Sequence, residues 1–174
     1  MRVARTVPLI LSVAVASILA LALACDDDDP TGIIEDAEFI APLLGGGNER
    51  PDPVASAGSG RALFDFDEDP DEVRFLVEVE DIEDVTLAHI HFGDVGTAGP
   101  IIVELFNAGG NPVDFTDRDV LAEGTFDDDD FVVGDIVDLD DLLAAMEAGN
   151  TYVNVHTTTN PAGEIRDQIE ERNP

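Results

Sequence analysis

Alternating apolar and polar residues mark two neighbouring segments of the chain, RALFDFD (61–67) and VRFLVEVE (73–80). In each segment every second residue is apolar, and the residues between them include Asp or Glu. Successive side chains of a strand point to opposite faces, so this pattern predicts two half-buried strands with acidic outer faces. The connecting segment EDPDE (68–72) is rich in turn residues and predicts that the two strands form a hairpin.

Other segments with the composition of short strands occur along the chain. They are residues 37–44, 85–91, 100–106, 120–126, 151–156 and 163–170. One helix is predicted over 138–150, with Asp138 or Asp140 as its N-cap and Gly149 at its end. Eight short strands separated by turn signals, with one short helix, predict an all-β fold, an antiparallel Greek-key-like β-sandwich.

The first 25 residues form a leader that differs from the rest of the chain. Two arginines precede an apolar run of 18 residues from Val7 to Ala24, which is typical of a secretory signal peptide. This length is at the lower limit for a membrane-spanning helix, so an uncleaved anchor stays open as an alternative. The segment LALAC (21–25) resembles the lipidation signal of bacterial lipoproteins. The resemblance implies an extracytoplasmic chain that is anchored to a membrane through lipid on Cys25.

Acidic residues begin directly after Cys25. Residues 26–34 start with four aspartates and predict a solvated tether, and residues 35–172 are predicted to form the folded domain. The chain has 39 acidic and 8 basic residues, a net charge of −31. Such a surface repels nucleic acid, so a nucleic-acid-binding function is excluded. Salt would screen the self-repulsion, which favours a halophilic source.

Candidate chemistry centres on the three histidines of the chain. His89 and His91 lie two residues apart in a predicted strand, so both side chains are expected on one face, and His156 lies in another predicted strand. Cys25 is the only cysteine, which excludes an intrachain disulfide and a cysteine-built metal site in the domain. If the two strands are neighbours, the three imidazoles converge and can hold copper or zinc. The alternative is that they hydrogen-bond neighbouring groups and only stabilise the sandwich.

Three separated blocks of the sequence resemble one family. The blocks are GGNERPDPVASAGSGRALFDF, LAHIHFGDVGTAGPIIVELF and AGNTYVNVHTTTNPAGEIRDQI, and in order and spacing they are similar to the CHRD domain, first described in chordin. The likeness covers about residues 36–170. The chain departs from the family pattern at ERPDP (49–53), which lacks the usual proline pair, and at Asp167, where glycine is usual. The resemblance implies a non-catalytic, extracellular module.

HIHFGD (89–94) and HTTTNPAG (156–163) are also similar, more weakly, to segments of copper/zinc superoxide dismutases, which are β-sandwiches too. The copper–zinc pair of that family takes six histidines and an aspartate, whereas this chain has three histidines in all. The acidic surface would also repel the superoxide anion. Dismutase activity is therefore not expected.

The sequence thus predicts no enzyme. The expected function is that of a surface-anchored CHRD module that binds an unidentified protein or polysaccharide, with copper or zinc binding at His89, His91 and His156 as the alternative. Arg166, one of few cations in the domain, is expected to pair with a carboxylate such as Glu164. The segment NPAGE (160–164) predicts a tight turn in which Gly163 adopts a positive φ.

Overall fold

A computed structural model describes residues 37–66, 72–132 and 134–172 of the chain. The leader, Cys25 and the acidic tether, as well as most of the segment that joins the two predicted hairpin strands, lie outside the described residues. The strands are β1 (Phe39–Gly45), β2 (Ser59–Phe66), β3 (Val73–Glu80), β4 (Ile82–Phe92), β5 (Ile101–Asn107), β6 (Val113–Phe115), β7 (Asp119–Phe126), β8 (Thr151–Thr157), β9 (Ile165–Gln168) and β10 (Glu170–Glu171). Two 3₁₀ turns, η1 (Gly46–Asn48) and η2 (Asp128–Asp130), and one α-helix, α2 (Leu139–Glu147), complete the described elements.

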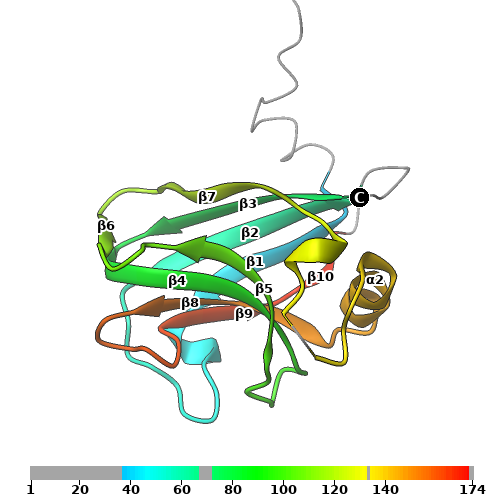
Figure 1. Cartoon of the computed structure of the whole chain (residues 1–174). Helices are drawn as coiled ribbons and strands as arrows, with labels where there is room; N and C mark the ends of the chain where they lie inside the picture. Colours follow the sequence, from blue (N-terminus) through cyan, green and yellow to red (C-terminus); the bar gives the residue numbers. More distant parts are fainter. Residues whose placement is uncertain (1–36, 67–71, 133, 173–174) are drawn as a thin grey trace, which may run out of the picture.

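The described strands form one antiparallel sheet that curls into a nearly closed sandwich (Figure 1). Along the sheet the strands follow the order β5-β4-β8-β9-β1-β2-β3-β7, with β10 paired to β1 and β6 to β4. The edge strands β5 and β7 approach each other. Consecutive strands β3 and β4 lie far apart in this order, so the connection crosses from one part of the sheet to another. The all-β antiparallel sandwich with one helix is confirmed.

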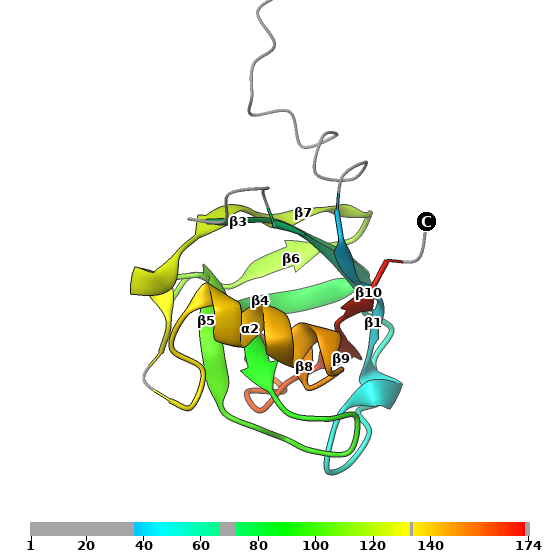
Figure 2. The ribbon, with the colours of Figure 1, turned by 90° about the vertical axis from the view of Figure 1, so that its right-hand side faces the viewer.

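The core lies inside the curled sheet and is closed at one end by α2 (Figure 2). The Asp138 side chain accepts a hydrogen bond from the Asp141 backbone N–H and caps the helix, which decides between the two predicted caps. Leu142 and Met146, one helical turn apart, are buried in the core. Gly149 follows the helix with a φ of 67°, the left-handed conformation that glycine adopts most easily.

The predicted hairpin is confirmed, with β2 and β3 paired from Ser59↔Glu80 to Phe66↔Val73. Its outer face is less exposed than the alternation indicated, because Leu63 and Leu76 are buried there in a second small cluster. Asp65 is also buried on this face and pairs with Arg74. The outer face of β2 is therefore more buried than the predicted half-buried strand.

Two further elements differ from the sequence pattern. The short strand β6 (Val113–Phe115) and the turn η2 (Asp128–Asp130) lie on either side of the predicted strand 120–126, at positions where no element was predicted. The last predicted strand, 163–170, begins later than expected, because Gly163 and Glu164 still belong to the turn. Gly163 has the positive φ that the NPAGE pattern predicted.

Candidate metal centre

Two neighbouring strands place the three histidines on one face of the sheet. β4 carries His89 and His91, β8 carries His156, and their antiparallel register sets His89 opposite Asn154 and Leu87 opposite His156. The alternate residues of both strands, including Ala88 and Val155, point into the apolar core. The histidines therefore lie on the outer face, away from the core, as the spacing of His89 and His91 requires.

The structure brings all three imidazoles together. One ring nitrogen from each histidine lies within 4.8 Å of the others, and the nearest pair, His89 Nδ1 and His156 Nε2, is 3.0 Å apart. An ion with metal–nitrogen bonds of about 2 Å holds tetrahedral nitrogens about 3.3 Å apart, so nitrogens 4.8 Å apart would have to approach by about 1.5 Å. The histidines therefore meet, as the metal hypothesis requires, and one of the nitrogen pairs lies at a distance that suits a shared ion.

Backbone carbonyls fix the orientation of two of the rings. His91 Nδ1 lies 3.0 Å from the Gly99 carbonyl oxygen, and His156 Nδ1 lies 3.2 Å from that of Pro161. A carbonyl only accepts, so both Nδ1 atoms carry the proton and both Nε2 atoms carry the lone pair. His91 Nε2 is buried and has no hydrogen-bond partner among the described residues. A carbonyl-oriented imidazole with a free Nε2 is the usual arrangement of a metal ligand.

Burial keeps the cluster uncharged at neutral pH. The three side chains are buried, and burial lowers the pKa of His89 and of His91 to about 4, with neighbouring imidazoles adding to the effect on His89. Burial also lowers the pKa of His156. Each ring therefore holds a lone pair at pH 7, and a metal would not have to compete with a proton for it.

The glycine-rich loop between β4 and β5 packs against His91. The Tyr152 ring stacks on His91 at 4.9 Å between centroids, and its hydroxyl oxygen accepts a 2.9 Å hydrogen bond from Gly99 N–H. Gly99 has no room for a side chain, because a Cβ atom would lie 1.6 Å from the Phe92 carbonyl oxygen. Glycine is therefore required at position 99 for the close backbone approach that brings the Gly99 carbonyl to His91.

Arg166 fixes the same loop to the sheet. Its guanidinium lies 3.4 Å from the centre of the Tyr152 ring and donates hydrogen bonds to the carbonyl oxygens of Asp94 (2.9 Å) and Thr97 (2.8 Å). The predicted pair with Glu164 was wrong. Glu164 lies in the turn before β9 and accepts hydrogen bonds from other side chains. Arg166 extends instead to the loop that packs against His91.

A buried polar pair lies beside the cluster on the same face. Glu49 is 3% exposed, and its Oε2 accepts a 3.4 Å hydrogen bond from Asn154, the neighbour of His89 across the strands. Burial raises the pKa of Glu49 to about 7, although the positive charge of Arg166 acts in the opposite direction. The other oxygen of Glu49 and the amide oxygen of Asn154 have no hydrogen-bond partner among the described residues.

Glu104 lies at the solvent edge of the cluster, and the sequence did not indicate it. It belongs to β5 opposite His89, and its Oε2 is 3.9 Å from His89 Nε2. The register of β4 and β5 shifts at two places, between Ala88 and His89 and between Ile90 and His91. Counting residues from the turn could not have placed Glu104 beside His89, because each shift changes which residues are opposite.

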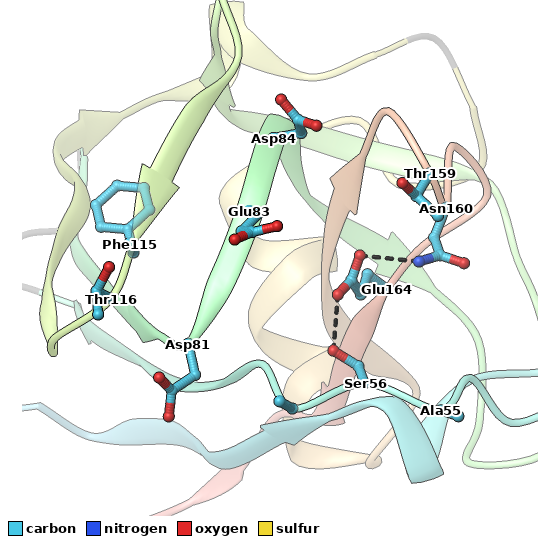
Figure 3. A pocket seen from close by; sticks show the side chains of 11 residues that line it. Ala55, Ser56, Asp81, Glu83, Asp84, Phe115, Thr116, Thr159, Asn160 and Glu164 are labelled. Carbon is cyan, nitrogen blue, oxygen red and sulfur yellow. Dashed lines mark hydrogen bonds between the residues drawn. The ribbon is translucent and has the colours of Figure 1, made fainter.

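A separate acidic pocket of about 440 Å³ lies between the β3–β4 turn, β6 and the 157–164 turn (Figure 3). Asp81, Glu83 and Asp84 line it together with Glu164. The Glu164 carboxylate accepts hydrogen bonds from three side chains, Ser56 (2.7 Å), Thr157 (2.6 Å) and Asn160 (2.8 Å). These bonds tie the turn to the loop before β2, so Glu164 has a structural role in this pocket.

These observations define the class of protein: an antiparallel β-sandwich module with a buried histidine cluster on its outer face and an acidic surface. The family model of the CHRD domain matches residues 40–169, so the chain belongs to the CHRD family. No curated protein and no solved structure matches the chain. No described helix is long and apolar enough to cross a membrane. Membership of the family is consistent with a binding or structural role.

Proposed function

We propose that this chain is a non-catalytic CHRD module located outside the cytoplasm, and that its outer-face cluster binds one copper or zinc ion through His89, His91 and His156. The observation that carries the proposal is the meeting of the three imidazoles, with one ring nitrogen of each within 4.8 Å of the others. In the same cluster, His91 Nε2 is buried and has no hydrogen-bond partner among the described residues. Leaving a buried acceptor without a partner costs about 1–3 kcal/mol, and an ion would remove that cost. Three neutral imidazoles with their orientation set by carbonyls are ligands that suit Zn²⁺ and Cu²⁺.

The same proposal includes attachment to the cell envelope. The leader and Cys25 support lipidation, and CHRD domains are extracellular modules, which supports a place on the outer side of a membrane. The module is also proposed to bind a protein or polysaccharide of the cell envelope. The histidine cluster gives the module a ligand of its own, and the ion would also stabilise the folded domain by binding only to it.

Metal content tests the proposal. The full chain is loaded with copper or zinc, desalted exhaustively and analysed beside the His89→Ala/His91→Ala double variant. About one tightly held ion per chain in the wild type, lost in the variant, is the expected result. Equal and weak binding in both chains would reflect only the acidic surface and would refute the metal site. Thermal unfolding of both metal-free chains checks that the variant is folded.

A further inference from the structure

Glu104 lies beside the histidine cluster, with its Oε2 3.9 Å from His89 Nε2. It lies on β5, directly opposite His89 in the ladder, with its side chain 51% exposed. Asn107 donates a 3.1 Å hydrogen bond to its Oε2. The same oxygen lies 3.9 Å from His89 Nε2, which is too long for a hydrogen bond but within reach of a small side-chain rotation.

The proton positions in the metal-free cluster follow from the carbonyl contacts. Because His156 Nε2 can only accept, the 3.0 Å contact from His89 Nδ1 requires that His89 carries its proton on Nδ1. His89 Nε2 then holds the lone pair and faces Glu104. Without metal, therefore, His89 donates to His156, and two groups that can only accept, Nε2 and the carboxylate, face each other.

An ion in the cluster changes this arrangement. His156 Nε2 points to His89 Nδ1, so an ion bound by His156 lies on the Nδ1 side of His89. Nδ1 of His89 must then release its proton and offer its lone pair. The neutral ring keeps one proton, which moves to Nε2 by exchange with solvent, so Nε2 becomes a donor that faces Glu104.

We infer that Glu104 is a positioning residue of the metal site, which accepts the Nε2 proton of His89 while His89 Nδ1 binds the ion. The inference rests on the proposed function. Ligating histidines commonly donate their second ring N–H to a carboxylate or carbonyl, and this partner strengthens the ligand. In this cluster the Gly99 and Pro161 carbonyls accept the second ring proton of His91 and His156. Glu104 is placed to accept the corresponding proton of His89.

Zinc titration of the full chain tests this role, with the wild type compared with Glu104→Gln. The amide at 104 has nearly the same shape but is a weaker acceptor, so zinc affinity is expected to fall about ten- to hundredfold. Glu123→Gln is the matched control, since Glu123 is an exposed strand glutamate on β7 and its substitution removes the same charge. An equal loss of affinity in both variants would mean that Glu104 contributes only long-range charge.

The nitrogen signals of His89 give a readout that a purely structural role would not change. In the zinc-loaded, ¹⁵N-histidine-labelled chain, His89 is expected to be metal-bound at Nδ1 and protonated at Nε2. Metal bound at His89 Nε2, or unchanged zinc affinity in Glu104→Gln, would overturn the role of Glu104 while the proposed function stands. A wild type that binds no zinc through its histidines would overturn both.

Discussion

The pH dependence of stability tests the burial of Glu49, whose carboxyl group is enclosed without full hydrogen bonding. Its Oε1 has no partner among the described residues, and burial raises its pKa to about 7 from an ordinary value of 4.5. A group whose pKa is raised on folding contributes stability at low pH, and this contribution is lost as pH rises through the folded pKa. For Glu49 that loss occurs between about pH 4.5 and pH 7.

The difference between the two pKa values corresponds to about 3.4 kcal/mol at high pH. Glu49→Gln keeps the shape and the hydrogen bond with Asn154 and removes the ionisation. Linkage gives a cost of ionising Glu49 of about 0.8 kcal/mol at pH 5 and about 3.4 kcal/mol at pH 8.5. The gain in unfolding free energy caused by the substitution should therefore be about 2.5 kcal/mol larger at pH 8.5 than at pH 5.

Urea unfolding of the metal-free wild type and variant at both pH values measures this difference. Effects of the substitution that do not depend on pH cancel, because only the change between the two conditions is compared. Glu123→Gln, an exposed substitution of the same kind, is the control for removal of one carboxylate. A Glu49→Gln effect that is the same at pH 5 and pH 8.5 would refute the raised pKa and the enclosed state of the carboxyl group.

Three further predictions follow from the structure. Burial lowers the pKa values of His89 and His91 to about 4 from 6.5, so their contribution to stability is fully present above about pH 6.5 and is lost as pH falls through 4. In metal-free urea unfolding, His91→Phe should therefore reduce the loss of unfolding free energy between pH 7 and pH 4.5 by about 2.5 kcal/mol. An equal loss in both chains would contradict this. Gly163→Ala should lower the free energy of unfolding by about 2–4 kcal/mol, because a Cβ atom there would lie 2.4 Å from the Asn154 amide. Gly109→Ala, also at positive φ but in open space, should cost about 1 kcal/mol, and equal shifts in the thermal unfolding midpoint would argue against the contact. The thermal unfolding midpoint should rise from low salt to molar salt, since the net charge is −31, and an unchanged midpoint would contradict the halophilic interpretation.

The sequence predicted most of the fold because its strands alternate clearly and its helix carries a cap, an apolar turn spacing and a terminal glycine. The strand VRFLVEVE coincides with β3, and the helix pattern differs from α2 only at its ends. The short strand β6 was not predicted, because three residues are too few to show an alternation of apolar and polar positions. Asp65 looked exposed by alternation, but its pairing with Arg74 allows it to be buried.

The candidate site was predicted in part. The side-by-side placement of His89 and His91 follows from strand geometry alone, but their meeting with His156 depends on β4 and β8 being neighbours, which only the topology decides. Glu49 and Glu104 reach the site through a loop and through a shifted register, and no local pattern marks either among the many carboxylates. Arg166 was misassigned because proximity in sequence favoured Glu164, whereas its side chain extends to the loop after β4.

X-ray absorption spectroscopy of the zinc- or copper-loaded chain tests the central claim most directly, because it reports the ligand atoms themselves. The account predicts three imidazole nitrogens at about 2.0 Å from the ion, with the imidazole signature lost in the His89→Ala/His91→Ala variant. A coordination shell built only of oxygen atoms, as carboxylates of the acidic surface would provide, would contradict it.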